Sequence, residues 1–256
     1  MDEVILIETA GGVRTITLNR PGARNALSGE LIGRLAEALA AAEDDPGVAA
    51  VVLTGADPAF CAGLDLREVG ARGMSQEAVT HVKASPWLTL GAMETPVVGA
   101  VNGPAVTGGL ELALQCSFLV ASERAVFADT HARVGVHPGG GLTGLLPQAV
   151  GLRRAREMSF TGRFVGAEEA YRIGLVNHVV PHQQLVPFAQ RLAGEIAAID
   201  PATVQALNAT YRDVAVTTLG EGLELERTRF ADWKLSPADV EARRQAVIDR
   251  GRSKLG

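Results

Sequence analysis

Aromatic residues and cysteines are both scarce in this chain of 256 residues. Phe, Trp and Tyr make up 4% of it, too few for the stacking platforms that bind single-stranded nucleic acid. The formal net charge of −5 also argues against a broad nucleic-acid surface, so we expect no nucleic-acid partner. The two cysteines, Cys61 and Cys116, provide no disulfide framework, and each lies in an apolar context that is typical of a small buried thiol.

Long apolar runs are missing as well. The apolar stretches are interrupted by Gly, Pro or a charge well before the roughly 18 residues that a membrane span requires. Residues Met1-Asp2-Glu3 begin no basic and apolar signal sequence. We therefore expect a cytoplasmic protein with no membrane partner.

The histidines give little support for a metal site. Of the five, His178 and His182 are four residues apart, but Pro181 lies between them. The flanking residues VNHVVP are typical of a strand, so the two rings are not expected to form a helical pair of ligands. We predict no metal.

What the sequence does contain is a regular alternation of short strands and helices. Residues 4–19 predict a β-hairpin, and a helix is expected to begin near Ser28, a favourable N-cap. Residues 48–55 form a continuous apolar run, the pattern of a strand buried on both faces of a parallel sheet. Further strands are predicted over residues 96–101 and 117–123. The repetition predicts right-handed crossovers in a layered α/β core.

The last third of the chain is mainly helical in pattern. Helices are predicted over residues 142–150, 167–174, 183–199, from Pro201 onward, 219–233 and 237–250, with one less regular segment over 76–93. Such amphipathic helices can cap the protein's own core or pack against neighbouring subunits. We predict a core over residues 1–195 that carries the site and a helical region over residues 196–256.

The stretch from Pro96 to Cys116 has the strongest signs of function. A helix is expected from about Gly109, with Glu111 in its first turn inside the apolar run LELAL. A buried unpaired carboxylate costs several kcal/mol, roughly, so Glu111 should be paired, neutral or useful. The helix start at Gly108 leaves backbone N–H groups free to face an anion or a polarised carbonyl oxygen. The alternative is a glycine-rich turn that leads into a core helix, with Glu111 in a structural ion pair.

A second glycine-rich run, Pro138-Gly139-Gly140-Gly141, resembles a phosphate cradle only superficially. It lacks the Gly-x-Gly-x-x-Gly order after a strand, and it lacks the lysine of a P-loop. We interpret it as a tight turn before a helix.

Four segments together resemble the crotonase family, the enoyl-CoA hydratase/isomerase group. They are TITLNRPGARNAL, FCAGLDLREV, TPVVGAVNGPAVTGGLELALQC and AEEAYRIGLVNHVVP, in that order and at suitable spacing. The resemblance spans roughly residues 4–185. It implies an α/β fold of the ClpP/crotonase type, a spiral of ββα repeats with a helical C-terminal trimerisation region. It also implies a homotrimer or a dimer of trimers.

The resemblance further implies an acyl-CoA thioester as the substrate, with coenzyme A as part of that substrate and no separate cofactor. Two backbone N–H groups, those of Leu64 and Gly108, would polarise the thioester carbonyl, and losing one such donor typically costs about 2.7 to 4 kcal/mol in activation energy. Arg24 and Arg67 would contact phosphates, or else be solvated surface charges. The full set implied for coenzyme A is Arg24, Ala26, Ala62, Leu64, Asp65, Leu66, Arg67 and Gly108.

The implied catalytic residues are Glu111 and, at the place where hydratases of the family carry a second glutamate, His131. His131 would donate a proton, hold the water, or only shape the pocket. Asp129 is a candidate substitute if the segment is regularly extended, because alternate residues of such a segment point the same way. The resemblance implies an enoyl-CoA hydratase that gives a 3-hydroxyacyl-CoA. The alternatives are an isomerase, a decarboxylase or other enolate chemistry, and a non-catalytic acyl-CoA-binding protein.

Overall fold

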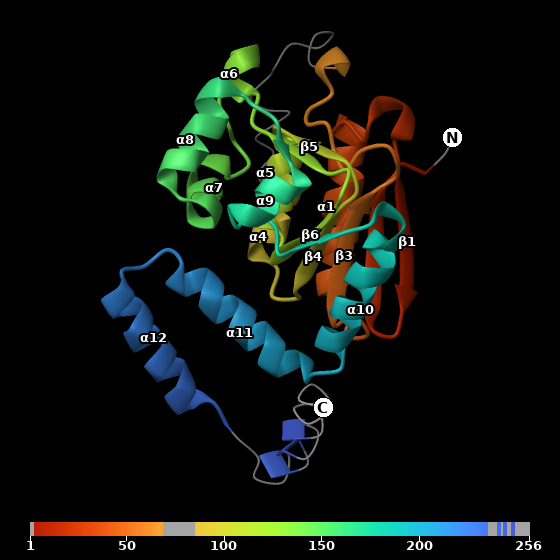
Figure 1. Cartoon of the computed structure of the whole chain (residues 1–256). Coiled ribbons are helices and arrows are strands. Elements are labelled where there is room, and N and C mark those ends of the chain that lie inside the picture. The colour runs from red at the N-terminus through yellow and green to blue at the C-terminus, as the bar shows by residue number, and fades with distance from the viewer. Residues whose placement is uncertain (1–2, 69–84, 235–239, 242, 245–246, 249–256) are drawn as a thin grey trace. The chain divides into compact units, whose positions relative to one another are not determined.

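The computed structural model describes residues 3–68, 85–234, 240–241, 243–244 and 247–248. The chain forms two compact units, Met1–Asn208 and Ala209–Gly256, and each is described by itself. All strands of the described residues belong to the first unit (Figure 1).

A six-stranded sheet forms the centre of the first unit. Its strands are, in spatial order, β1 (Ile5–Ala10), β2 (Val13–Leu18), β3 (Ala50–Gly55), β4 (Val97–Val101), β6 (Phe118–Ser122) and β9 (His178–Val180). Only the first pair is antiparallel: β1 and β2 form the predicted hairpin, with Ile5 opposite Leu18 and Ala10 opposite Val13. The other pairs are parallel, and every residue of β3 is buried, which confirms the prediction from its continuous apolar run.

A second, three-stranded sheet lies beyond the carboxyl end of β4. It contains β5 (Pro104–Val106), β7 (Val126–Ala128) and β8 (Val165–Gly166). Strands β5 and β7 are parallel, whereas β7 and β8 are antiparallel. The chain therefore passes twice from the large sheet into the small one, and each passage places a turn and a helix after a short strand.

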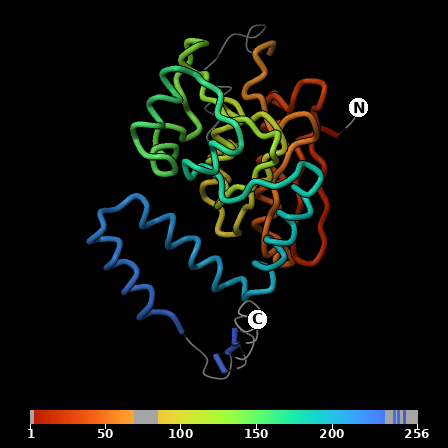
Figure 2. The backbone as a smooth tube through the Cα atoms, viewed as in Figure 1, coloured from red at the N-terminus to blue at the C-terminus, as the bar shows by residue number. Residues whose placement is uncertain are grey.

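Helices cover both faces of the large sheet. On one face, α10 (Leu185–Ala197) packs against β2, β3, β4 and β6 and buries Leu185, Ala189 and Ala193. Segments far apart in sequence thus lie side by side (Figure 2): Gln190 Nε2 donates to Thr15 Oγ1 at 3.0 Å across 175 residues. On the other face, α1 (Gly29–Glu43) buries Leu31, Leu35 and Leu39, and the Ser28 side chain accepts from the Leu31 N–H as the predicted N-cap.

The first unit contains eight further helices among its described residues, apart from α11. They are η1 (Pro21–Ala23), α4 (Pro86–Ala92), α5 (Gly108–Gln115), α6 (His131–Val134), α7 (Leu142–Val150), α8 (Leu152–Thr161), α9 (Ala167–Arg172) and η2 (His182–Gln184). The helices predicted over residues 142–150, 167–174 and 183–199 are confirmed within a few residues at each end. The segment predicted over 76–93 lies partly outside the described residues, and its described part contains α4.

Two longer helices follow. Helix α11 (Pro201–Val214) begins in the first unit, and α12 (Leu219–Asp232) belongs to the second. Both helices begin at their predicted positions. At the start of α12, Thr218 and the third helical residue, Glu221, form a capping box. Most of the helix predicted over residues 237–250 lies outside the described residues. The division predicted at residues 195 and 196 stays a prediction, as does the role of the last region in trimerisation.

Candidate active site

Two loops that are 44 residues apart in sequence carry the predicted N–H donors, and a short parallel bridge brings them together. Cys61 pairs with Ala105: the Cys61 N–H donates to Pro104 O at 3.0 Å, and the Val106 N–H donates to Cys61 O at 3.0 Å. Beyond this bridge the two segments pass so closely that a Cβ on Gly63 would lie 2.1 Å from Thr107 Oγ1. Gly63 also has φ +92°, so both the backbone and the space around it require glycine.

The two donors, Leu64 N–H and Gly108 N–H, follow directly after this contact. Within the described part of the chain neither group donates to a protein acceptor, although the neighbouring amides Asp65 N–H and Thr107 N–H do. Thr107 has φ +48° and ψ −115°, which is an outlier for a β-branched residue and costs on the order of 1–3 kcal/mol. The predicted pair of free donors is therefore present.

Glu111 lies on the first turn of α5, three residues after Gly108. Its side chain is buried, and the residue is only 3% exposed. One carboxylate oxygen, Oε1, accepts from the Gly140 N–H at 2.7 Å and from the Leu142 N–H at 3.5 Å. The other, Oε2, lies 3.7 Å from His131 Nε2. Burial raises the pKa of Glu111 above its ordinary value, although the Gly140 hydrogen bond and the charge of His131 oppose the rise.

His131 opens α6 and its ring is turned toward Glu111, so the two residues predicted to be catalytic are brought together. His131 is 7% exposed. The structure corrects the expectation for Asp129, because the segment is not extended: β7 ends at Ala128 and a turn at Thr130 leads into α6. In this turn Asp129 Oδ1 accepts from the His131 backbone N–H at 3.1 Å and bonds His131 Nδ1 at 2.7 Å. Asp129 therefore contacts the far side of the imidazole and is no substitute for it.

Asp129 is itself 1% exposed. Burial raises the pKa of its carboxyl group, but hydrogen bonds from His131 and Ser159 outweigh this effect, and the net pKa is lowered. Asp129 is therefore the ionised end of a chain of three groups, Asp129, His131 and Glu111.

Gly140 contacts the predicted catalytic carboxylate, a contact that the sequence did not indicate. The run Pro138–Gly141 forms the predicted turn before α7, and the Gly140 N–H within it also donates to Glu111. A Cβ at this position would lie 2.7 Å from Trp87 Cδ1 and 2.9 Å from Glu111 Cδ. Trp87 in turn donates from Nε1 to Gly108 O at 3.1 Å. Trp87 and Gly140 therefore link the Glu111 carboxylate to the turn that carries the Gly108 N–H. The only sign of this cluster in the sequence is the density of glycines.

The residues predicted to contact coenzyme A come from two segments that pair along their backbones. The Ala62 N–H donates to Arg24 O at 3.1 Å, and the Asp65 N–H donates to Leu27 O at 3.0 Å. Arg24, Leu66 and Arg67 are exposed, whereas Ala26 is buried and Ala62, Leu64 and Asp65 are partly buried. The segments thus present one continuous edge, although contact with coenzyme A stays a prediction.

Arg20 holds this edge together, which the sequence did not indicate. Its guanidinium bonds the Asp65 carboxylate at 3.0 Å and the carbonyl oxygen of Ala26. Hydrogen bonds from Arg20 and from the Arg67 N–H lower the pKa of Asp65 against the effect of burial, which raises it. The Asp65 side chain is therefore engaged within the protein.

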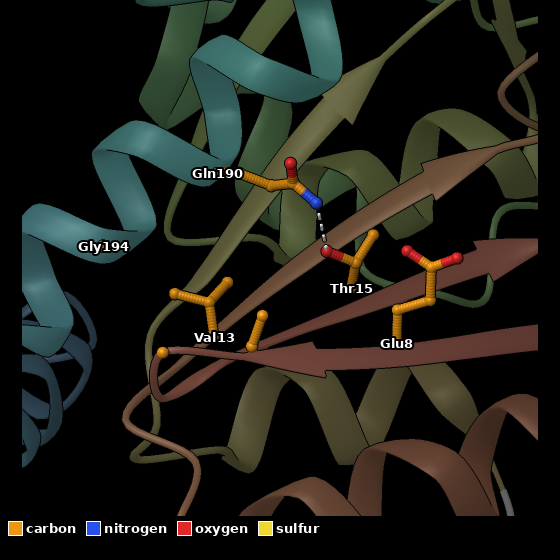
Figure 3. A pocket seen from close by; sticks show the side chains of 7 residues that line it. Glu8, Val13, Thr15, Gln190 and Gly194 are labelled. Carbon is orange, nitrogen blue, oxygen red and sulfur yellow. Dashed lines mark hydrogen bonds between the residues drawn. The ribbon is translucent and has the colours of Figure 1, made fainter.

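A different part of the first unit contains a hollow of about 330 Å³. Glu8, Val13, Thr15, Gln190 and Gly194 line it, between the β1–β2 hairpin and α10 (Figure 3). None of the predicted site residues lies in its lining. In the described ranges, no group of three or more His, Cys, Asp or Glu side chains is arranged to hold a metal ion. No helix of those ranges is both long and apolar enough to cross a membrane.

The chain is similar to proteins of known family. The model of a family described as enoyl-CoA hydratase/isomerase matches residues 8–248. The mitochondrial enoyl-CoA hydratase of Pongo abelii is 39% identical over 235 residues, which cover 89% of this chain and 79% of the relative. A crystal structure of an enoyl-CoA hydratase from Mycobacterium tuberculosis H37Rv aligns with a TM-score of 0.76 and 50% identity, over 88% of this chain and 96% of that one. An enoyl-CoA hydratase from Bacillus anthracis aligns with a TM-score of 0.89 and 33% identity, over 97% of both chains.

Proposed function

The chain belongs to the enoyl-CoA hydratase/isomerase family, and from that premise we propose that it adds water to 2-enoyl-CoA thioesters to give 3-hydroxyacyl-CoA. The crotonase-type α/β fold predicted from the sequence is confirmed. The observation that carries the proposal is the placement of Glu111 and His131. Their side chains face each other across 3.7 Å, one helical turn beyond a backbone N–H group that has no partner among the described residues.

The two free N–H groups supply the electrostatic part of the reaction. When water adds to the double bond, negative charge develops on the thioester oxygen. The N–H groups of Leu64 and Gly108 would bind this oxygen, and because both are fixed by the Cys61–Ala105 bridge they need no rearrangement as the charge develops. The outlying backbone of Thr107 is the structural cost of that preorganisation.

The side-chain pair supplies the acid–base part. Glu111 Oε2 would take one proton from water as its oxygen bonds to the β-carbon of the substrate, and protonated His131 would give the proton from Nε2 to the α-carbon. The product then contains one water, while the site is left with a neutral Glu111 carboxyl and a neutral imidazole. Passage of the proton from Oε2 to Nε2 across 3.7 Å restores the starting state, directly or through a second water molecule.

The edge formed by Arg24, Ala26 and Ala62 with residues 64–67 would hold the coenzyme A part of the substrate. Arg24 and Arg67, both exposed, are proposed to bind its phosphates. No cofactor beyond the coenzyme A of the substrate is proposed. A homotrimer or a dimer of trimers, and a cytoplasmic location, remain proposals; relatives of this chain include a protein named mitochondrial and one named peroxisomal.

The test is a product-resolved assay with 2-enoyl-CoA thioesters of increasing chain length. We expect loss of the ultraviolet absorbance of the conjugated thioester and formation of 3-hydroxyacyl-CoA. The Glu111→Gln variant should lose about 10²- to 10⁴-fold in kcat, as expected for removal of a general base. Glu30→Gln is the matched control, because Glu30 is exposed on the first turn of α1. Movement of the double bond, loss of a carboxyl group, or binding without turnover would refute hydration.

A further inference from the structure

Asp129 has no role in the proposed reaction, yet it is among the least exposed charged residues of the described part of the chain. It is 1% exposed, and burying an ionised carboxylate is costly unless its oxygens are bonded. Its Oδ1 accepts from the backbone N–H of His131 at 3.1 Å and faces the ring Nδ1 at 2.7 Å. Ser159 on α8 also bonds the carboxylate. The group is therefore fixed from three directions.

We propose that Asp129 is a positioning residue, which holds the proton of neutral His131 on Nδ1 so that Nε2 faces Glu111 and the substrate. The geometry allows this because a carboxylate accepts hydrogen bonds and does not donate them, so a bond of 2.7 Å to Nδ1 requires a hydrogen on that nitrogen. The same N–H bond orients the ring, and the backbone N–H of His131 holds the same carboxylate oxygen at 3.1 Å.

The positioning matters because His131 must change its protonation state at Nε2 in each cycle. After Nε2 has given its proton to the α-carbon, the ring is left neutral with its remaining hydrogen on Nδ1. In that state Nε2 has a lone pair directed at Glu111 Oε2, 3.7 Å away, and can take back the proton from the Glu111 carboxyl group. If neutral His131 held its hydrogen on Nε2 instead, this return step would be blocked. The inference therefore rests on the proposed hydration.

Among the described residues, the charged groups that face the ring come from two places in the fold. Asp129 approaches from the turn between β7 and α6, and Glu111 approaches from α5. The α8 side contributes Ser159, which is uncharged, and Arg133 of α6 is directed to the Thr161 carbonyl oxygen. Removal of the Asp129 charge is therefore expected to act on His131 with little compensation from other residues.

The first experiment uses the wild-type protein without substrate. Nitrogen-15 NMR of the histidine side chains distinguishes the two neutral tautomers, and the His131→Gln variant assigns the His131 signals among those of the five histidines. We expect hydrogen on Nδ1 in wild type and a loss of that preference in Asp129→Asn. A neutral wild-type ring that carries its hydrogen on Nε2 would overturn the inference, whatever reaction the protein catalyses.

The second experiment measures kinetics over a pH series. Asp129→Asn should lower kcat by about 10²- to 10⁴-fold with KM little changed, since the substrate contacts remain. The pH profile of kcat should also change, because the negative charge that lies 2.7 Å from the His131 ring is removed. In the double variant with His131→Gln, the Asn substitution should cost nothing further. An unchanged profile, or an additional loss in the double variant, would overturn the inference.

The matched control is a second aspartate–histidine pair in the same protein. Asp57 Oδ2 lies 2.9 Å from His182 Nε2, and His182 Nδ1 bonds Ser122 Oγ at 3.0 Å. Asp57→Asn removes the same kind of contact at a place where no proposed site residue takes part, so kcat and its pH profile should stay unchanged. If wild type fails to hydrate enoyl-CoA while NMR shows the predicted tautomer, the proposed function fails and the positioning role of Asp129 stands.

Discussion

Replacing Gly140 by alanine is the substitution whose effect follows most directly from the geometry of the site. The added Cβ would lie 2.7 and 2.8 Å from two atoms of the Trp87 ring and 2.9 Å from Glu111 Cδ, whereas ordinary contacts begin at 3.4 Å. Something must therefore move by about half an ångström or more. Trp87 is buried and bonded to Gly108 O, and Glu111 is buried and bonded to the moving residue itself, so neither side chain can give way freely.

Two effects of Gly140→Ala can be given magnitudes. Overpacking of a buried position costs typically about 1–3 kcal/mol of stability. A catalytic group displaced by about 1 Å loses on the order of 10²-fold in rate. Here the displaced group is either Glu111, the proposed general base, or Trp87, which is bonded to Gly108 O. We therefore expect kcat/KM for an enoyl-CoA thioester to fall by about 10²-fold while the protein still folds.

The assay is hydration followed by absorbance, together with thermal unfolding of each variant. Gly139→Ala is the matched control: it lies in the same turn, it is exposed, and no atom lies within 4 Å of its Cβ position. This variant should behave as wild type or be slightly more stable, because alanine restricts the unfolded chain. Full activity of Gly140→Ala would refute the reasoning. Equal losses in both variants would show that the conformation of the turn is responsible, and not the contact of the added Gly140 Cβ with Trp87 and Glu111.

Three further predictions follow from the same region. Burial raises the pKa of Glu111, so its charge opposes folding, and this penalty is absent below the ordinary carboxyl range and grows as pH rises toward the folded pKa. Glu111→Gln should therefore raise Tm at neutral pH, a gain that disappears in acid, and wild-type activity should fall as pH drops through the raised pKa. Gly109→Ala should prevent stable folding, since its Cβ would lie 2.0 Å from Cys61 O; soluble protein of wild-type Tm would contradict this. Arg20→Ala should raise KM for coenzyme A thioesters more than it lowers kcat, and the reverse pattern would refute its place at the binding edge.

The elements that could be predicted from the sequence are those specified by local chemistry. Ser28 is an N-cap because its side chain reaches an N–H three residues ahead. Residues 48–55 predict a buried strand because the six residues from Val48 to Leu53 are all apolar. Glu111 stood out because a carboxylate in an apolar helix needs a partner. In each case the decisive neighbours are within a few residues, or the required environment is independent of which neighbour supplies it.

The relations that could not be predicted depend on which distant segments meet. Nothing near Gly140 indicates that its N–H binds a carboxylate 29 residues earlier, and nothing near Arg20 indicates Asp65, 45 residues later. For Asp129 the obstacle is local conformation. A regularly extended segment would point Asp129 and His131 the same way, but the turn at Thr130 places Asp129 Oδ1 against the His131 ring. The alternative of a structural ion pair for Glu111 stays a prediction beside the catalytic one: its partners are backbone N–H groups and His131, and no Lys or Arg side chain is bonded to it among the described residues.

The donors of the proposed oxyanion site are main-chain amides, which hold their hydrogens at any pH a protein survives. The half of the site that polarises the thioester is therefore the same in acid and in base, and only the carboxylate and imidazole opposite it respond to pH. The thioester oxygen is thereby assigned to backbone amides, whereas the protons that move are assigned to two side chains. A substitution at position 131 would therefore change which protons are exchanged with the substrate, and hence the class of product. The proposed binding of the thioester oxygen would be unaffected, because it depends on the backbone at Gly63 and Thr107.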